Sequence, residues 1–244
     1  CVGQPLALTP TPALPLCGGG GTQHFLFPLP FWGRVWEGDL AQKVGIVTGL
    51  QLEAEIARGF QSADVLCLGP GPMKALQAAE HLVEKGATAL MSFGIAGGLE
   101  PGLKAGDIIA SPDALGAALS AKGHSIATIP DPAMTPQDKA ALYKKSGACA
   151  VDMETSAVRD VAQAHGVPFL ILRAICDEAG DTIPDIALKG VSTDGKTQPV
   201  RVAAGLLTRP GDVPALIHLG KQQKKAVSAL QNAVRMLEYR VDMK

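Results

Sequence analysis

The sequence predicts a single-domain α/β fold with a mixed central β-sheet flanked by helices. From residue 43 onward, short runs of apolar residues alternate with stretches whose apolar positions recur at helical spacing. Strands that are apolar along their whole length are buried on both faces, so helices are expected to cover both sides of the sheet. With 244 residues, 47% of them apolar, the chain can bury one substantial core.

The expected strands and helices follow one another between residues 43 and 175. The helix that begins at Met73 stops before Gly86, a residue type that commonly ends helices. Residues 94–98 are expected to form a glycine-rich loop, and residues 112–136 have no clear pattern. Strands are expected at 43–49, 64–68, 87–93, 107–111, 148–151 and 169–175. Helices are expected at 51–60, 73–85, 137–145 and 153–165.

The two ends of the chain depart from this alternation. Residues 1–42 contain many prolines and the run Gly18–Gly21 but no periodicity, which predicts a Pro/Gly-rich extension that is disordered or non-native. A Pro-rich ligand or targeting arm is the alternative. Residues 43–244 are then the folded domain. Within it, residues after Gly180 look loop-like, and a helix is expected from 214 to about 239.

This last helix has two interpretations. Its apolar positions, among them Leu230 and Val234, fit a terminal helix packed on the core. Its lysines, among them Lys221 and Lys225, also fit a basic amphipathic helix that makes peripheral contact with an anionic membrane surface.

Composition excludes several classes of protein. A net charge of −1 and an aromatic content of 4% leave neither the electrostatic footprint nor the stacking platforms of a nucleic-acid-binding protein. Five cysteines without a CxxC pair predict no metal site and indicate a reducing, cytoplasmic compartment. No apolar run reaches the roughly 20 residues that span a bilayer, and no organic cofactor is implied.

Two acidic motifs end apolar runs. Val151-Asp152-Met153-Glu154-Thr155 follows one predicted strand, and Arg173-Ala174-Ile175-Cys176-Asp177 ends the next. A carboxylate in such a position costs solvation energy unless it is paired or used. The two motifs therefore predict acid–base work on a small polar substrate at the carboxyl edge of the sheet.

Three blocks, in order, resemble the nucleoside phosphorylase and nucleosidase superfamily. They are GIVTGLQLE at 45–53, SFGIAGGL at 92–99 with AGDII at 105–109, and the two acidic motifs. Within the superfamily, their wording and the segment 207–211 look closest to the hopanoid-associated phosphorylases. Those enzymes are thought to remove adenine from adenosylhopane, a lipid joined to the ribose 5′ carbon. The resemblance implies this fold, this activity in hopanoid biosynthesis, and a homodimer or higher oligomer.

The resemblance also implies two catalytic residues. Asp177 would be the general acid that protonates the leaving purine at N7. Glu53 would position and deprotonate the attacking water. The plainer interpretations are a turn residue after a strand for Asp177 and an exposed helix position for Glu53.

Further residues would bind the substrate. Glu154 would accept hydrogen bonds from the ribose 2′ and 3′ hydroxyls, unless it is simply a first-turn helix acid. Met153 would pack under the sugar. Asp152 stands where the family usually has Glu, so its role stays open. The backbone of residues 94–97 would approach the substrate closely: Gly94, Ile95, Ala96 and Gly97.

Two departures affect the purine pocket. Cys176 stands where many relatives have Ser before the catalytic Asp. Residues 112–147 are shorter than in relatives, in which this region contacts the purine, and Met134 is the proposed substitute. The shortened region also allows a non-catalytic nucleoside-binding protein.

The nucleophile is predicted to be water. Phosphorylases of the superfamily carry an arginine just before the glycine block and another in the first loop, and both are missing here, which leaves Arg58 and Arg173 as conceivable phosphate partners. The resemblance implies that the protein binds a lipid-linked or small adenosine as its substrate. Two enzymatic alternatives remain: a methylthioadenosine/S-adenosylhomocysteine nucleosidase, and a purine nucleoside phosphorylase that uses phosphate.

Overall fold

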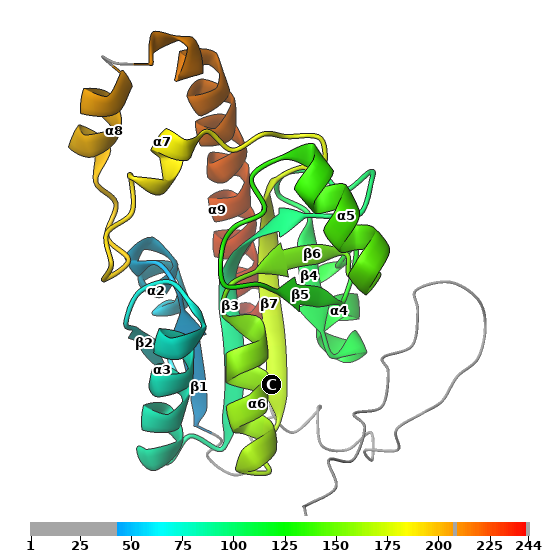
Figure 1. The fold of residues 1–244 in the computed structure, drawn as a ribbon. Coiled ribbons are helices and arrows are strands. Elements are labelled where there is room, and N and C mark those ends of the chain that lie inside the picture. Colours follow the sequence, from blue (N-terminus) through cyan, green and yellow to red (C-terminus); the bar gives the residue numbers. More distant parts are fainter. Residues whose placement is uncertain (1–42, 207–208, 243–244) are drawn as a thin grey trace, which may run out of the picture.

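A mixed α/β sheet flanked by helices is confirmed by the computed structural model, which describes residues 43–206 and 209–242 (Figure 1). The prediction for residues 1–42 lies outside these residues. The described strands are β1 (Val44–Thr48), β2 (Ala63–Cys67), β3 (Ala89–Gly98), β4 (Ile108–Ser111), β5 (Ile126–Thr128), β6 (Ala150–Asp152) and β7 (Phe169–Asp177). The described helices are α2 (Gln51–Ala57), α3 (Pro72–Glu84), α4 (Asp113–Leu119), α5 (Pro136–Ser146), α6 (Thr155–Ala164), α7 (Asp185–Leu188), α8 (Pro199–Leu206) and α9 (Val213–Asp242), with a 3₁₀ turn at Pro210–Asp212.

Strand β3 is the centre of the sheet. It pairs in parallel with β1 and β7, and its last residues, Gly97 and Gly98, pair with β6 in the antiparallel direction. Strand β2 pairs with β1, β4 pairs with β7, and β5 pairs with β6, so each extends the sheet outward. The carboxyl ends of β1, β3 and β7 therefore lie at one edge of the sheet, where ligands of such folds bind.

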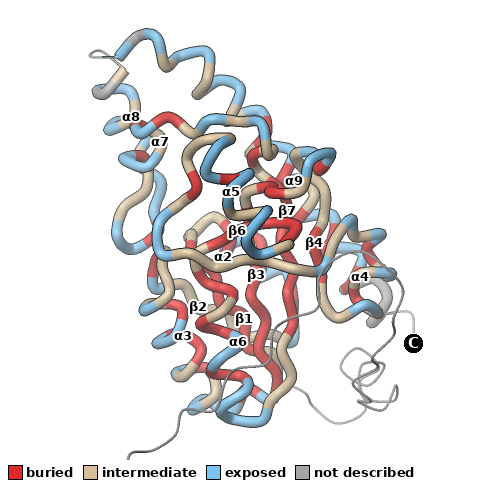
Figure 2. Tube along the Cα trace, turned by 45° about the vertical axis from the view of Figure 1, so that its right-hand side comes forward, coloured by how far each residue is buried: buried red, intermediate tan, exposed pale blue. Residues whose placement is uncertain are grey.

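Helices cover both faces of the sheet, as the continuous apolar strands require. Helices α3 and α6 pack on one face in a cluster that contains Leu82, Leu90 and Val158. Helices α2 and α9 pack on the other face around Ile46 and Phe93. Figure 2 shows the buried strands β1, β3 and β7 enclosed by these half-exposed helices.

Two expectations about secondary structure were wrong, and one stretch without a clear pattern contains regular elements. The glycines at 94–98 belong to β3 rather than to a loop, because this stretch pairs with both β6 and β7, with a register shift between Ala96 and Gly97. The unpatterned residues 112–136 include α4 and β5, and the loop-like region after 180 includes α7 and α8. These elements are short and rely on tertiary contacts, so local periodicity does not reveal them.

Helix α9 packs on the core. Its residues Ala226, Leu230, Ala233, Val234 and Leu237 are buried in the cluster that covers β3 and β7, so the interpretation as a core-packed helix is confirmed. Within the described part of the chain, no helix is long and apolar enough to cross a membrane.

Truncating Leu230 to Ala is expected to lower the free energy of unfolding by about 2–5 kcal/mol, because the side chain is fully buried and its removal leaves a cavity. Met236 on the same helix is 47% exposed, so Met236→Ala should cost much less. Urea unfolding of both variants measures the difference. Equal costs would contradict the packing of α9 described above.

Candidate active site

A cavity of about 720 Å³ lies at the carboxyl edge of the sheet. The ends of β1, β3, β6 and β7 form its floor, while the segment from 183 to 202 and the start of α9 form its opposite wall. Nine of the residues predicted for the site line this cavity: Glu53, Ile95, Ala96, Gly97, Asp152, Met153, Glu154, Cys176 and Asp177.

Glu53 is the third residue of α2 and is only 3% exposed. Its Oε2 accepts hydrogen bonds from the backbone N–H groups of Gly49 (3.0 Å) and Leu50 (2.9 Å), and Oε1 accepts one from Ile95 (2.8 Å). Burial, together with the charge of Glu154, raises its pKa to about 7, although Arg173 opposes this. Glu53 is therefore not a surface residue, and near neutral pH it can exchange a proton.

Gly94 is required by this arrangement. A Cβ built at residue 94 would lie 2.4 Å from Glu53 Oε1, and its φ of 150° is one that side chains rarely allow. Gly94 does not itself line the cavity. It lets the backbone pass close behind the carboxylate, so that the N–H of Ile95 can donate to Glu53.

Arg173 is a fully buried cation beneath the cavity floor. Its Nη2 lies 2.8 Å from Asp152 Oδ2 and 3.5 Å from Glu154 Oε2, and it donates to Ser92 Oγ at 2.7 Å. Burial alone would lower the pKa of Arg173, but the neighbouring carboxylates outweigh that effect and raise it. Arg173 is therefore held charged among three acidic side chains.

Asp152 and Glu154 contact Arg173 differently. Both oxygens of Asp152 are occupied by protein donors, because Oδ1 accepts from Thr128 (2.9 Å) and Oδ2 is bound by Arg173 and the Thr155 hydroxyl. Glu154 is held by the N–H of Gly71 at Oε1 (2.9 Å), and its Oε2 has only the long contact with Arg173. Burial raises the pKa of Glu154. Of the two, Glu154 has an oxygen available to a ligand.

Asp177 ends β7 and is 3% exposed. Cys176 donates its S–H to Asp177 Oδ1 at 2.9 Å. Burial and the adjacent Asp177 charge raise the pKa of the Cys176 thiol well above its usual value, so the thiol keeps its proton. Cys176 is thus a hydrogen-bond donor to Asp177.

Sequence reasoning missed the partner of the other Asp177 oxygen. Lys139 on α5 has no exposed surface, and its Nζ lies 2.5 Å from Asp177 Oδ2. Helix α5 is polar overall and carries exposed lysines at 144 and 145. One buried lysine among them leaves no signal in the sequence pattern.

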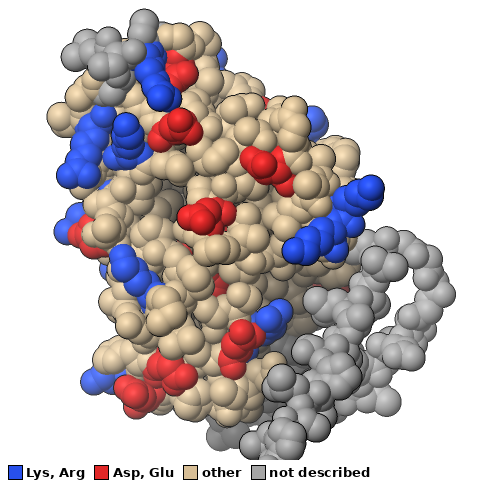
Figure 3. Space-filling model, viewed as in Figure 1, with Lys and Arg blue, Asp and Glu red and all other residues tan. Residues whose placement is uncertain are grey.

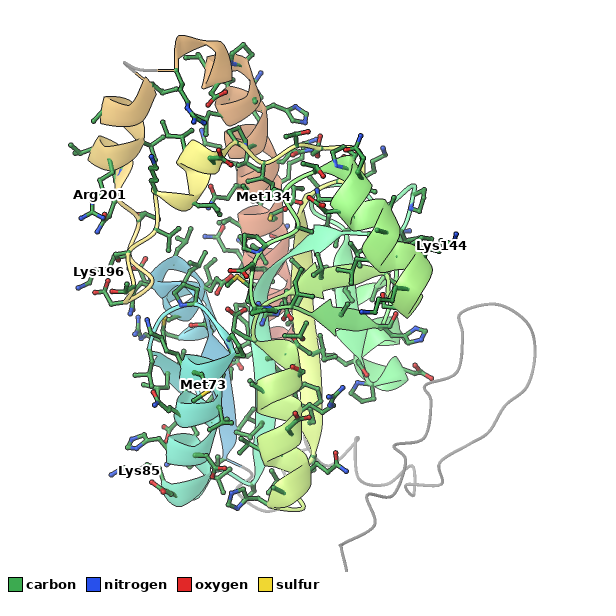
Figure 4. The ribbon with its side chains drawn as sticks, viewed as in Figure 1. Met73, Lys85, Met134, Lys144, Lys196 and Arg201 are labelled. Carbon is green, nitrogen blue, oxygen red and sulfur yellow. The ribbon has the colours of Figure 1, made fainter. Side chains whose placement is uncertain are left out.

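Met134 is not among the residues that line the cavity. Its backbone carbonyl accepts a hydrogen bond from the N–H of Ile183 at 2.8 Å, and Figure 4 labels the residue. Its neighbours Pro132 and Ala133, together with Ile129, line the cavity instead. The region 112–147 therefore contributes apolar rather than aromatic side chains to the cavity.

The outer part of the cavity is mainly apolar, with Ser192, Thr193, Thr197 and Gln223 as its polar side chains. Helices α7, α8 and α9 and the segments before them supply its apolar side chains: Ile183, Leu188, Val191, Val202, Leu216 and Leu219. Among the described residues that line the cavity, Lys74 is the one cation, and its Nζ binds the carbonyl of Thr193. No group of three metal-ligating side chains occurs in the part of the chain that the structure describes.

The mixed sheet with helices on both faces matches the fold of nucleoside phosphorylases and nucleosidases. Residues 125–207 match the sequence model of the Phosphorylase superfamily. This stretch contains Asp152, Glu154, Arg173 and Asp177.

Solved structures of similar fold include three bacterial enzymes. Futalosine hydrolase of Helicobacter pylori has a TM-score of 0.59 at 17% identity over 84% of this chain and 99% of its own. The 5′-methylthioadenosine/S-adenosylhomocysteine nucleosidase of Neisseria meningitidis has a TM-score of 0.59 at 17% identity over 80% and 98%. S-adenosylhomocysteine nucleosidase of Streptococcus pyogenes has a TM-score of 0.52 at 18% identity over 57% and 85%. At these identities the likeness shows the fold.

Two curated proteins share a short segment with this chain. Uncharacterized proteins of Mycobacterium bovis and Mycobacterium tuberculosis are each 56% identical to it over 34 residues. That segment is 14% of this chain, and the chain spans about half (46%) of the length of these relatives.

The buried position of Glu53 predicts a pH-dependent stability. Its pKa is about 7 in the folded chain against 4.5 as its ordinary value, so the folded state binds this proton more tightly. The resulting stability is fully present below pH 4.5 and is lost as pH rises to about 7. The difference between these two pKa values corresponds to about 3 kcal/mol of unfolding free energy.

Glu53→Gln should remove this loss, so the fall in unfolding free energy from pH 4.5 to 7 should be smaller than in the wild type. Glu55→Gln, at an exposed position of the same helix, should keep the wild-type slope. Urea unfolding at several pH values measures both. Parallel curves for the wild type and Glu53→Gln would show that Glu53 is not desolvated.

Proposed function

We propose that this chain hydrolyses the N-glycosidic bond of a 5′-substituted adenosine and releases adenine. The observation that carries the proposal is that three buried carboxyls, each with different surroundings, lie around one cavity. Glu53 has a pKa of about 7, Glu154 has an oxygen open to the cavity, and Asp177 is held by a thiol and an ammonium. Carboxyls placed in different environments can take different roles in one reaction.

Cleavage of the bond between C1′ and N9 builds positive charge on the ribose and negative charge on the purine. Asp177 delivers a proton to N7 of the purine, which neutralises the leaving group. Glu154 accepts hydrogen bonds from the ribose hydroxyls and orients the sugar. Glu53, above its pKa, takes a proton from the water that attacks C1′. Met153, which lines the cavity between these groups, packs under the sugar.

The nucleophile is water because the cavity offers little to bind a phosphate dianion. Arg173 lies beneath the floor and is already bound to Asp152, Ser92 and the carbonyl of Ile95. Arg58 is exposed at the end of α2 and does not line the cavity. Desolvating a dianion without a free cation is costly. The Arg173 network therefore favours hydrolysis over phosphorolysis.

The apolar outer cavity supports a substrate with a large apolar 5′ substituent, such as adenosylhopane. The purine and ribose would occupy the carboxyl-lined floor, and the substituent would lie against α7, α8 and α9. A lipid-linked substrate would also bring the protein to a membrane surface. Methylthioadenosine, with its small apolar 5′ group, fits the same cavity, which makes a methylthioadenosine nucleosidase the second candidate.

Adenine release from adenosylhopane and from methylthioadenosine, each with and without phosphate, tests the reaction. Release is expected without phosphate and should fall by a factor of about 100 or more in Asp177→Asn, which cannot donate the carboxyl proton. Absolute dependence on phosphate would make the protein a phosphorylase. Tight adenosine binding without release of adenine would make it a binding protein.

The pH profile of the same assay tests Glu53. The residue must be deprotonated to act as base, so kcat/KM should rise with pH through about 7. Glu53→Gln should abolish hydrolysis at every pH, while Glu55→Gln should leave both the rate and the profile unchanged. A profile that is flat between pH 5.5 and 8.5 would exclude Glu53 as the base.

The apolar outer cavity makes a separate prediction about the 5′ substituent. Leu219→Glu places a charge against it and should raise KM for adenosylhopane by about tenfold or more, since apolar contact is lost and a charge is desolvated. Hydrolysis of methylthioadenosine should change little. Ile217→Glu, at an exposed position of the same helix that does not line the cavity, is the control. Equal effects of Leu219→Glu on both substrates would contradict this placement.

A further inference from the structure

The buried lysine on α5 is the charged group closest to the general acid that the proposed function names. Lys139 has no exposed surface and does not line the cavity, so it approaches Asp177 from the protein side while Asp177 faces the cavity. A buried ammonium is costly unless it is fully paired. A lysine in this position therefore needs an explanation beyond packing.

The contacts of Lys139 use every proton of the ammonium group. Nζ lies 2.5 Å from Asp177 Oδ2, 2.7 Å from the carbonyl of Glu178 and 3.2 Å from the carbonyl of Asp181. An ammonium has three N–H donors, and here each one has an acceptor. If one proton moves to Asp177, the neutral amine keeps two N–H groups for the two carbonyls, and its lone pair accepts from the new carboxyl O–H. Both protonation states are satisfied.

Residues 178–181 are fixed so that these carbonyls stay in place. Asp181 Oδ2 accepts from the N–H of Glu178 at 2.6 Å and from Gln222 Nε2 of α9 at 2.7 Å. Asp181 Oδ1 lies 3.1 Å from His218 Nε2, also on α9. Helix α9 thus holds the loop against Lys139, and the lysine is held against Asp177.

We propose that Lys139 is a positioning residue that holds Asp177 and supplies the proton that Asp177 gives to the purine. The inference rests on the proposed function, in which Asp177 protonates N7. Asp177 begins as a carboxylate that accepts from Lys139 Nζ at Oδ2. As the bond between C1′ and N9 breaks, its electron pair moves onto the purine, and one proton passes from Lys139 Nζ to Asp177 and from Asp177 to N7. Water adds to C1′ and gives its other proton to Glu53. After adenine leaves, Glu53 releases that proton to solvent and Lys139 takes one from solvent.

The test is a double-mutant cycle on the adenosine substrate that the wild type cleaves fastest. Lys139→Met keeps the apolar stem as far as Cε but removes the ammonium with its charge and protons, and it should lower kcat by about 100-fold while KM changes less than about threefold. In the Asp177→Asn background the same change should cost nothing further, because Lys139 acts through Asp177. Lys144→Met, at an exposed position of the same helix (labelled in Figure 4), is the matched control and should behave as wild type.

A kcat for Lys139→Met within about threefold of wild type, or a loss that adds to that of Asp177→Asn, would overturn the inference. If Lys139→Met fails to fold, Lys139→Arg gives the same decision, because it keeps the charge but its guanidinium does not release a proton. A reduced kcat at unchanged KM in that variant supports the proton supply, and a wild-type kcat overturns it. If the wild type itself releases no adenine, the proposed function fails and this inference falls with it.

Discussion

The site depends on one buried cation. Arg173 lies in β7 and contacts Ser92 and Ile95 of β3, Asp152 at the end of β6, and Glu154 at the start of α6. Without a buried positive charge, the acidic side chains gathered here would repel one another in a medium where each is already poorly solvated. With it, the ends of β6 and β7 and the start of α6 are tied to β3, and the carboxyls can be held near a substrate.

The same interaction divides the acidic residues by function. Asp152 is bound to Arg173 and to the first turn of α6, so it maintains the geometry. Glu154 and Glu53 lie farther from the charge of Arg173 than Asp152 does. The effect of burial is therefore larger than that of Arg173, and it raises the pKa of each. Asp177 lies at the other side of the floor, where a different cation, Lys139, holds it. Each group can thus serve a different part of the proposed reaction, and the reactive partners remain on the cavity side.

The distribution of cations also determines what the cavity can bind. Figure 3 shows basic and acidic side chains interspersed over the visible face. The two buried cations next to the cavity, Arg173 and Lys139, bind the protein's own carboxylates, and Lys74, which lines the cavity, binds a backbone carbonyl. The carboxyl-lined floor and the mainly apolar outer wall support the proposed substrate, a nucleoside with an apolar 5′ substituent. Helices α7 and α8 supply part of this outer wall.

Local patterns in the sequence predict the α/β class, most of the strands and helices between residues 43 and 177, and the two acidic motifs at strand ends. Apolar periodicity and the placement of carboxylates are properties of consecutive residues. Three features are visible only in the folded chain: Gly94–Gly98 continue β3, Arg173 binds Asp152, and the 183–202 segment forms a wall of the cavity. The tertiary structure also places Lys139 against Asp177. These features depend on pairing between residues far apart in the chain, and the energy of a buried charge depends on partners that no local pattern reveals.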